Sequence, residues 1–347
     1  MPVPKEIVSY CSSLVLLTVN ARGKEEAVLE LQLAHLSVKD YLLSNRVPQS
    51  FAKDFKEATA RASITQVYLA YLLELDGNLP VEKVRQSYWL AEYSAQYWMH
   101  HAVVVDSGSR QLCALIKEFF SREDAWTICY TLYDPDRPEG KYTQWVRCGI
   151  LSALYYASLG GSCFSVQLLL DKNSELNSYQ VGHGTILHAA MRNGHDKIVQ
   201  ILLKKRAKVN ARGGTYHTAL VAASYHGHDK VVKVLLDNNA DINAQGSFRG
   251  SALYAAADKG HDQVVQMLLN EGADVHARGG DYANALQAAS YHGHEKIVQR
   301  LLGEGANVDA QERFYGNALK AALARGHDKI AQMLRDSGAR TESEASD

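Results

Sequence analysis

The sequence predicts a mainly α-helical chain whose C-terminal part is a solenoid of six repeats with short hairpin tips. One observation is that Gly-His recurs with a step of 33 residues (227 − 194 = 33, and so on), at Gly194, Gly227, Gly260, Gly293 and Gly326. Another is that Leu-x-Ala-Ala precedes each pair at the same step, from Leu187, Leu220, Leu253, Leu286 and Leu319. A fixed step of this kind is the sequence signature of stacked repeats.

Each unit is expected to hold two short helices separated by a glycine. In one unit the first helix carries Leu220 and two small alanines, and Gly227 ends it. His228 and Asp229 open the second helix, where an acidic side chain favours the positive end of the helix dipole. An apolar stripe follows at Val231, Val232, Leu235 and Leu236. One unit cannot bury this stripe alone, so the units must stack.

Six such units are predicted from the register, because stepping back from Gly194 reaches Gly161. They cover residues 146–179, 180–212, 213–245, 246–278, 279–311 and 312–345. In the last unit Arg335 stands where the others have leucine, and a polar tail begins at Thr341. A polar outer face is what a terminal repeat requires.

The units resemble the ankyrin repeat. The best match to its motif is Thr185-Ile-Leu-His-Ala-Ala190, which ends at Gly194-His195. The chain departs from that motif in two columns. The proline column holds Ile186, Ala219, Ala252, Ala285 and Ala318, and the histidine column holds His188, Val221, Tyr254, Gln287 and Lys320. These departures are expected to make the hairpins less rigid.

The first half shows no repeat before about residue 148. Periodicity and capping signals predict a strand at 27–33 and helices at 6–18, 37–43, 51–72, 81–101, 111–120 and 122–132. A cluster of proline and glycine at 134–140 marks the junction with the solenoid. We therefore divide the chain into residues 1–48, 49–145 and 146–345.

Three phrases in this half resemble fungal NACHT–ankyrin proteins, which are STAND-type, NLR-like switches. They are Leu-Ala-His-Leu-Ser-Val-Lys-Asp-Tyr-Leu at 33–42, Leu-Ala-Glu-Tyr-Ser-Ala-Gln-Tyr-Trp at 90–98 and Leu-Tyr-Asp-Pro-Asp-Arg-Pro at 132–138. The resemblance implies that 1–48 is a partial winged-helix-like segment, 49–145 a helical linker domain and 146–345 an ankyrin sensor. The NTPase domain of that family would lie outside this chain.

The motifs of common enzyme classes are absent from the sequence. It has no G-x-x-x-x-G-K-[ST] phosphate loop, no G-x-S-x-G nucleophile elbow and no H-E-x-x-H zinc motif. His-Asp occurs once per repeat at His195, His228, His261 and His327, and its place at a helix start favours a structural role over a metal site. His100 and His101 have no cysteine or acidic partner at ligand spacing, so we interpret them as helix-end histidines. We expect no enzyme activity, no cofactor and no metal; an unrecognised site in 1–147 is the alternative.

The net charge and the cysteines indicate which classes of partner and which cellular compartment fit this chain. The formal net charge is −1, so the chain lacks the basic surface that non-specific nucleic-acid binding requires. The five cysteines show no C-x-x-C spacing, which favours a reducing compartment. The apolar run at 7–19 is too short to span a bilayer. We expect a cytoplasmic protein, with the nucleus as an alternative, and no membrane association; the oligomeric state stays open.

A protein partner is expected on the concave face, at the hairpin tips and at the ends of the first helices. The candidate contact residues are Arg192, Asn193, Tyr216, His217, Tyr225, His226, Phe248, Arg249, Asp258, Lys259, Tyr282, Tyr291, His292, Phe314, Tyr315 and Arg325. Tyrosine and arginine dominate the energetics of protein interfaces. The alternative is that the tip aromatics only pack on adjacent hairpins.

A longer period lies inside the first. Ser-Tyr-His-Gly-His at 224–228 recurs at 290–294, a step of 66 residues (290 − 224 = 66). Duplication of a two-repeat block explains it, and a ligand with two similar features about 20 Å apart is the sharper hypothesis, given helix layers of roughly 8–10 Å. The function predicted is a non-enzymatic interaction module, the ligand-sensing or scaffold end of a NACHT–ankyrin-type protein. A stand-alone regulatory adaptor is the alternative.

Overall fold

The computed structural model describes residues 15–20, 28–33, 57–75, 77, 79–103, 110–133, 152–171, 176–177, 179–180, 184–246, 250–311 and 316–340. The expected helix at 37–43, the junction at 134–140 and the polar tail from Thr341 lie outside these residues.

A β-hairpin comes first along the chain. Strands β1 (Val15–Asn20) and β2 (Val28–Leu33) are antiparallel, with Val15 opposite Leu33. The predicted strand at 27–33 is therefore confirmed. The predicted helix at 6–18 is wrong at its C-terminal end, because residues 15–18 lie in β1. That run is rich in apolar and β-branched residues, and it has a partner strand with which to pair.

Helices form the next region: α4 (Glu57–Leu73), α5 (Val81–Ser87), α6 (Ala91–Ala102), α7 (Arg110–Ser121) and α8 (Glu123–Leu132). The helices predicted at 111–120 and 122–132 are confirmed as α7 and α8, and α4 falls within the predicted long helix. The single helix predicted at 81–101 is wrong. It breaks at Tyr88, whose backbone is not helical (φ −124, ψ 78) and whose ring packs edge-on against Tyr71 at 6.3 Å.

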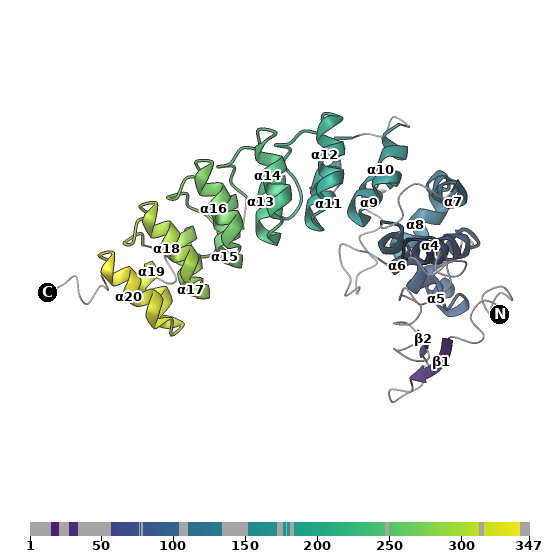
Figure 1. The fold of residues 1–347 in the computed structure, drawn as a ribbon, viewed down its shortest axis with the longest axis horizontal. Helices are drawn as coiled ribbons and strands as arrows, with labels where there is room; N and C mark the ends of the chain where they lie inside the picture. The colour runs from purple at the N-terminus through teal and green to yellow at the C-terminus, as the bar shows by residue number, and fades with distance from the viewer. Residues whose placement is uncertain are drawn as a thin grey trace, which may run out of the picture.

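Twelve helices in the described part of the solenoid form six antiparallel pairs that follow one another along an arc (Figure 1). The pairs are α9 (Ala153–Gly160) with α10 (Cys163–Leu170), α11 (Ile186–Arg192) with α12 (Asp196–Lys204), α13 (Ala219–His226) with α14 (Asp229–Leu236), α15 (Ala252–Lys259) with α16 (Asp262–Asn270), α17 (Ala285–His292) with α18 (Glu295–Gly303), and α19 (Ala318–Ala324) with α20 (Asp328–Asp336). Helices α11, α13, α15 and α17 lie on the inner side of the arc, and α12, α14, α16 and α18 lie on the outer side.

The start and end of each first helix explain why the sequence folds in this register. The N-caps form one column at the repeat step, namely Ser152, Thr185, Thr218, Ser251, Asn284 and Asn317. A hydroxyl or amide oxygen in this column accepts a backbone N–H of the first turn, as Thr218 does from Val221 at 3.2 Å. Gly227 ends α13 with φ +72, a conformation that favours glycine.

Short hairpins connect successive pairs and project beside the first helices. Strands β3 (Tyr179–Gln180) and β4 (Gly184–Thr185) pair in one, and Gly213 pairs with His217 in the next. In the following hairpin the Gly246 N–H donates to the Gly250 carbonyl at 2.7 Å.

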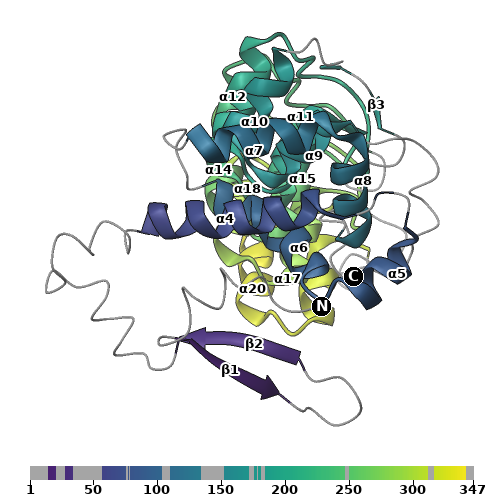
Figure 2. The same cartoon turned by 90° about the vertical axis from the view of Figure 1, so that its right-hand side faces the viewer.

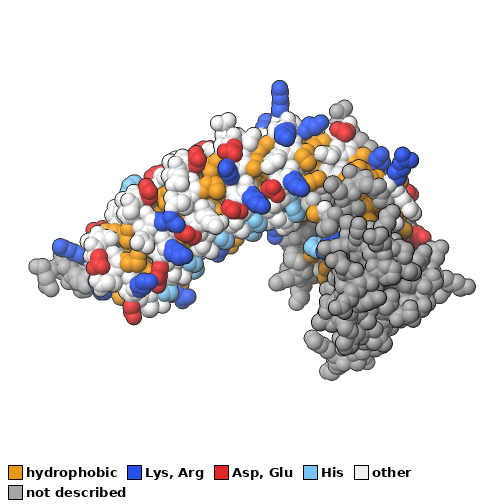
Figure 3. Space-filling model, viewed as in Figure 1, with side chains coloured by type: hydrophobic (Ala, Val, Ile, Leu, Met, Phe, Trp, Pro, Cys, Tyr) orange, Lys and Arg blue, Asp and Glu red, His pale blue; other side chains and the backbone are white. Residues whose placement is uncertain are grey.

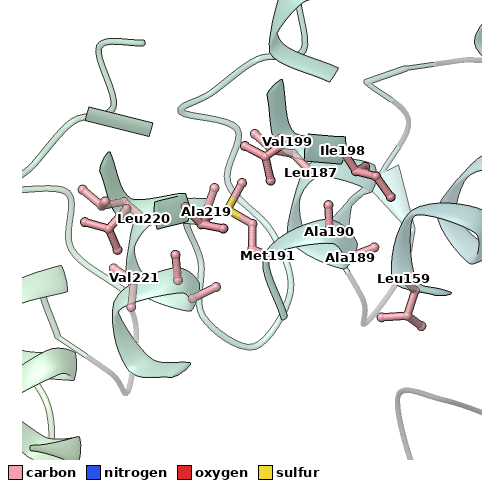
Figure 4. Packing of buried hydrophobic residues seen from close by; sticks show 14 of the residues in the cluster. Leu159, Leu187, Ala189, Ala190, Met191, Ile198, Val199, Ala219, Leu220 and Val221 are labelled. Atoms are coloured by element: carbon pink, nitrogen blue, oxygen red, sulfur yellow. The ribbon is translucent and has the colours of Figure 1, made fainter. Parts of the chain in front are cut away.

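The solenoid core is a continuous layer of leucine, valine, isoleucine and alanine between neighbouring pairs. Figure 4 shows Leu187, Ala190 and Met191 of α11 between Ile198 of α12 and Ala219 of α13, and all are buried. The small alanines let the first helices approach closely, and the larger side chains fill the space toward the second helices. This layer continues to Leu334 of α20, which is buried beside the exposed Arg335.

The histidine of each Gly-His pair joins two repeats. Its Nε2 lies within hydrogen-bond distance of a backbone carbonyl at the end of the first helix of the previous repeat. His261 Nε2, for example, lies 3.0 Å from the Tyr225 carbonyl. The same contact recurs at His195, His228, His294 and His327, each with the carbonyl 36 residues earlier. A Cβ on Gly227 would lie 2.5 Å from the His261 ring. The histidine therefore satisfies a helix-end carbonyl, and the glycine makes room for it.

Replacing one of these histidines should cost a modest amount of stability. We expect His261→Ala to lower the free energy of unfolding by about 1 kcal/mol, because it removes one inter-repeat hydrogen bond. Urea unfolding followed by circular dichroism measures the change. The control is His276→Ala, since His276 is exposed. Equal losses in the two variants would contradict the role assigned to His261.

The helical region packs against the first repeat through one buried hydrogen-bonded group. Trp98 Nε1 of α6 donates to the Tyr156 hydroxyl of α9 at 3.3 Å, and Cys129 Sγ of α8 lies 3.1 Å from the same hydroxyl. Burial raises the pKa of the Cys129 thiol to about 12, which keeps it protonated. Figures 1 and 2 show α7 and α8 beside α9 and α10, so the helical region covers the first end of the solenoid. No helix among the described residues is long and apolar enough to cross a membrane.

Candidate functional site

Four predicted residues come together at the end of α13. Tyr216, in the hairpin before the helix, packs against Tyr225 with ring centroids 5.0 Å apart and edge-on against His226 at 5.3 Å. Lys259 of the next repeat places its Nζ 4.8 Å from the centre of the Tyr225 ring. We call Tyr216, Tyr225, His226 and Lys259 the first aromatic cluster. A cation over a tyrosine face is an attractive contact.

The same arrangement is found two repeats later at the end of α17. Tyr282 packs against Tyr291 at 4.5 Å and edge-on against His292 at 5.4 Å. Arg325 of the next repeat places its guanidinium carbon 4.8 Å from the centre of the Tyr291 ring. We call Tyr282, Tyr291, His292 and Arg325 the second aromatic cluster. The 66-residue period of the sequence therefore corresponds to two clusters with the same ring types and the same contacts.

Side chains beneath the hairpins hold the tips in place. The Tyr254 hydroxyl accepts the backbone N–H of Tyr282 at 3.2 Å, and Tyr254 is buried. One step further along the column, Gln287 Nε2 donates to the carbonyls of Ala310 and Gly316 at 2.7 and 2.8 Å. At these two positions of the changed histidine column, tyrosine and glutamine bond to the backbone of the next hairpin, and the expected loss of hairpin rigidity stays a prediction.

Asp258, in the repeat between the clusters, connects one cluster to the other. Its carboxylate lies 3.0 Å from Lys259 Nζ of the first cluster and 3.2 Å from His292 Nε2 of the second. Its backbone carbonyl lies 3.3 Å from His294 Nε2. The residue is only 8% exposed, so this carboxylate is held within the structure by its two partners.

The electrostatic environment of this group follows from those contacts. Burial acts to lower the pKa of Lys259, but the hydrogen bond and charge of Asp258 outweigh burial and raise it, so the ammonium stays charged. Burial lowers the pKa of His294, which favours the neutral ring that contacts the Asp258 carbonyl.

The remaining predicted contact residues are not part of either cluster. Arg192 is half-buried, and its carbonyl meets His228 Nε2 at 3.1 Å. Asn193 Nδ2 donates to the Leu159 carbonyl at 2.8 Å, which gives it a structural contact between repeats. His217 is half-buried in its hairpin with φ +68. Phe248, Arg249, Phe314 and Tyr315 lie outside the described residues.

Sequence reasoning did not identify the supporting residues. Tyr254 and Gln287 were noticed only as departures from a motif, although a polar side chain at the third position of a helix can reach a neighbouring backbone. The histidines His228 and His294 stack against His226 and His292 at 5.8 and 6.0 Å. His228 and His294 are also histidines that join two repeats. The motif His-Gly-His, which places two histidines two residues apart, was therefore the sequence signal for this contact.

The two clusters consist of aromatic rings, imidazoles and cations. No group of three or more His, Cys, Asp or Glu among the described residues could hold a metal ion. The clusters combine tyrosine faces, imidazoles and cations, which are typical of protein-binding surfaces.

Comparison with known proteins identifies the repeat. A family model described as "Ankyrin repeats (3 copies)" matches residues 128–213, 154–246, 213–279 and 253–345, which together make up more than half of the chain. The chain belongs to the ankyrin-repeat family. A curated relative of this ankyrin-repeat chain is the azaphilone pigments biosynthesis cluster protein L of Monascus ruber, which is 32% identical over 214 residues. The match covers 56% of this chain and 44% of the relative, so the chain spans less than half the length of that protein.

Proposed function

We propose that this protein is a non-enzymatic protein-interaction module whose partner lies across the strip formed by the two aromatic clusters and Asp258. The observation that carries the proposal is the recurrence of one cluster, with the same contacts, two repeats apart. Ankyrin repeats suggest protein binding in general, and the repeated aromatic and cationic side chains are the kind that anchor interfaces. Helix ends and hairpin tips on the inner side of the arc present them to one extended partner.

The wider context we propose is the ligand-sensing or scaffold end of a signalling protein similar to the NACHT–ankyrin class. The phrases at 33–42, 90–98 and 132–138 support this context. The helical region supports it as well, because its buried contact with the first repeat would transmit a change in the solenoid to the segments before it.

Replacing both central tyrosines should remove partner binding. We expect Tyr225→Ala/Tyr291→Ala to reduce recovery of the bound partner at least about tenfold, because each alanine removes one anchor of roughly 1–2 kcal/mol or more. The measurement is affinity capture with the full chain, in which proteins recovered by the wild type and the variant are compared by quantitative mass spectrometry.

The control is Lys233→Ala/Gln299→Ala, two exposed residues of the outer helices that are also 66 positions apart (299 − 233 = 66). This variant should recover the same proteins as the wild type. If the tyrosine variant also recovers an unchanged set, the strip does not bind a partner.

A further inference from the structure

The charge of the two clusters indicates what kind of partner segment fits them. Each cluster has a cation over a tyrosine, and each hairpin begins with an exposed arginine, Arg212 or Arg278. These arginines are 66 residues apart (278 − 212 = 66). Asp281 is the opposing exposed charge in the second hairpin. Lys259, Arg325 and these two arginines outnumber Asp258 and Asp281, so the strip and its two hairpins combine rings with an excess of positive charge, although the whole chain has a net charge of −1.

We propose that this strip binds an extended acidic peptide segment, with carboxylates placed at each of the two clusters. The inference rests on the proposed function and adds the chemistry of the partner. Two repeats span about 20 Å if each helix layer adds roughly 10 Å. An extended chain advances about 3.3 Å per residue, so about six residues separate the two acidic features.

Asp258 shows how a carboxylate is bound at this place. Its oxygens meet Lys259 Nζ at 3.0 Å and His292 Nε2 at 3.2 Å, one group from each cluster. A cation and an imidazole bind this carboxylate of the chain itself. The same two kinds of group can bind a carboxylate of a partner.

The clusters differ in how much of their charge is available. Ala324 occupies in the second cluster the position that Asp258 occupies in the first (324 − 258 = 66). Among the described residues, no carboxylate lies at ion-pair distance from Arg325, which is exposed, whereas Lys259 is paired with Asp258. Arg325 should therefore contribute more to binding of an acidic peptide than Lys259 does.

A single-stranded nucleic acid would also be attracted to rings and cations, but a cation already lies over one face of each central tyrosine. Lys259 lies over Tyr225, and Tyr216 packs against the same ring. Arg325 lies over Tyr291, and Tyr282 packs against that ring, in the same way. Stacking of bases needs an open ring face. The geometry therefore favours carboxylates that bind to the cations lying over the rings.

The test uses the full chain and synthetic fluorescent peptides in anisotropy titrations. The probe carries two Glu-Glu pairs separated by about six Gly/Ser residues, chosen from the extended rise of the chain. One comparison peptide has its two pairs adjacent, another has Gln in place of every Glu, and an oligo-dT strand replaces the peptide in a third titration. We expect the spaced peptide to bind about tenfold more tightly than the adjacent one, since it engages both clusters at once. The Gln peptide should not bind.

Variants locate the binding. Lys259→Gln/Arg325→Gln should weaken the spaced peptide about tenfold, with Arg325→Gln alone causing the larger part. Lys230→Gln/Lys296→Gln removes two exposed cations with the same 66-residue spacing from the outer helices and should change the affinity by less than about twofold. Asp258→Ala gives the fourth repeat the alanine that the sixth repeat has at Ala324. It should strengthen peptide binding about threefold, because Lys259 and His292 lose their carboxylate partner within the chain.

Three results would overturn the proposal: equal binding of the Glu and Gln peptides, equal losses in the inner and outer variants, or tighter binding of oligo-dT than of the spaced peptide. The proposed function has a separate outcome. Loss of a captured protein in Tyr225→Ala/Tyr291→Ala, together with no binding of acidic peptides, would retain the interaction module and remove only its acidic partner.

Discussion

Trp98→Ala is expected to lower the free energy of unfolding by about 3–5 kcal/mol, the range for removal of a large buried aromatic side chain. Trp98 has no exposed surface, and it packs against Phe119 at 4.9 Å, Phe120 at 6.0 Å and Tyr156 at 6.4 Å. Its Nε1 donates to the Tyr156 hydroxyl, so the truncation leaves a cavity and removes one of the two hydrogen-bond partners of that buried hydroxyl, the other being Cys129 Sγ. Urea unfolding followed by circular dichroism gives the change directly.

The chain supplies a control of the same residue type. Trp89 is 49% exposed, and Trp89→Ala should change the free energy of unfolding by less than about 1 kcal/mol. Tyr156→Phe keeps the ring and removes only the hydroxyl between Trp98 and Cys129. This milder variant should stay folded, so it tests the same contact even where Trp98→Ala does not fold. A loss for Trp98→Ala no larger than that for Trp89→Ala would show that this contact does not hold the helical region to the solenoid.

This contact also bears on function. The helical region and the first repeat share one buried hydrogen-bonded group, so we expect a change in the order of the solenoid to affect α6 and α8 through Trp98 and Cys129. Tyr156→Phe tests that coupling: two separate unfolding transitions in this variant, against one in the wild type, would show that the hydroxyl makes the two parts cooperative.

The solenoid could be predicted in detail because each of its elements is encoded locally. The column from Ser152 to Asn317 caps a helix within three residues of itself, and Gly227 ends a helix by its own conformation. Contacts of this range repeat visibly at a constant step. The first half has no repeat to average over, and there a break at Tyr88 and a strand at 15–18 were missed.

The clusters could be predicted only in part for a similar reason. Tyr225 and Tyr291 were found because their motif recurs, but the cation over each ring comes from a residue 34 positions later. Asp258 was included by its column alone, and its link between two clusters depends on how far α15 and α17 lie apart. Side-chain contacts across repeats need the stacking geometry, which the sequence does not state.

Acid should destabilise the solenoid through His188 of α11. Its Nδ1 accepts the Thr185 backbone N–H at 3.2 Å, and burial lowers its pKa from 6.5 to about 4. Protonation would place a charge in a buried site and remove the acceptor of that bond. Because the folded pKa lies below the unfolded value, this contribution is complete above pH 6.5 and is lost as the pH falls toward 4. At about pH 5 the loss amounts to about 2 kcal/mol.

His188→Gln should remove this pH dependence while keeping the helix start. Glutamine at the third helical position is also a capping-box residue, and Gln287 already occupies the same column in the fifth of the six units. Between about pH 7.5 and pH 5, we expect the free energy of unfolding of the variant to fall by about 2 kcal/mol less than that of the wild type. Urea unfolding at each pH measures both values. A smaller slope should remain in both proteins, since burial also lowers the pKa of His195 and His294. Identical pH profiles for variant and wild type would mean that His188 is not the group that titrates.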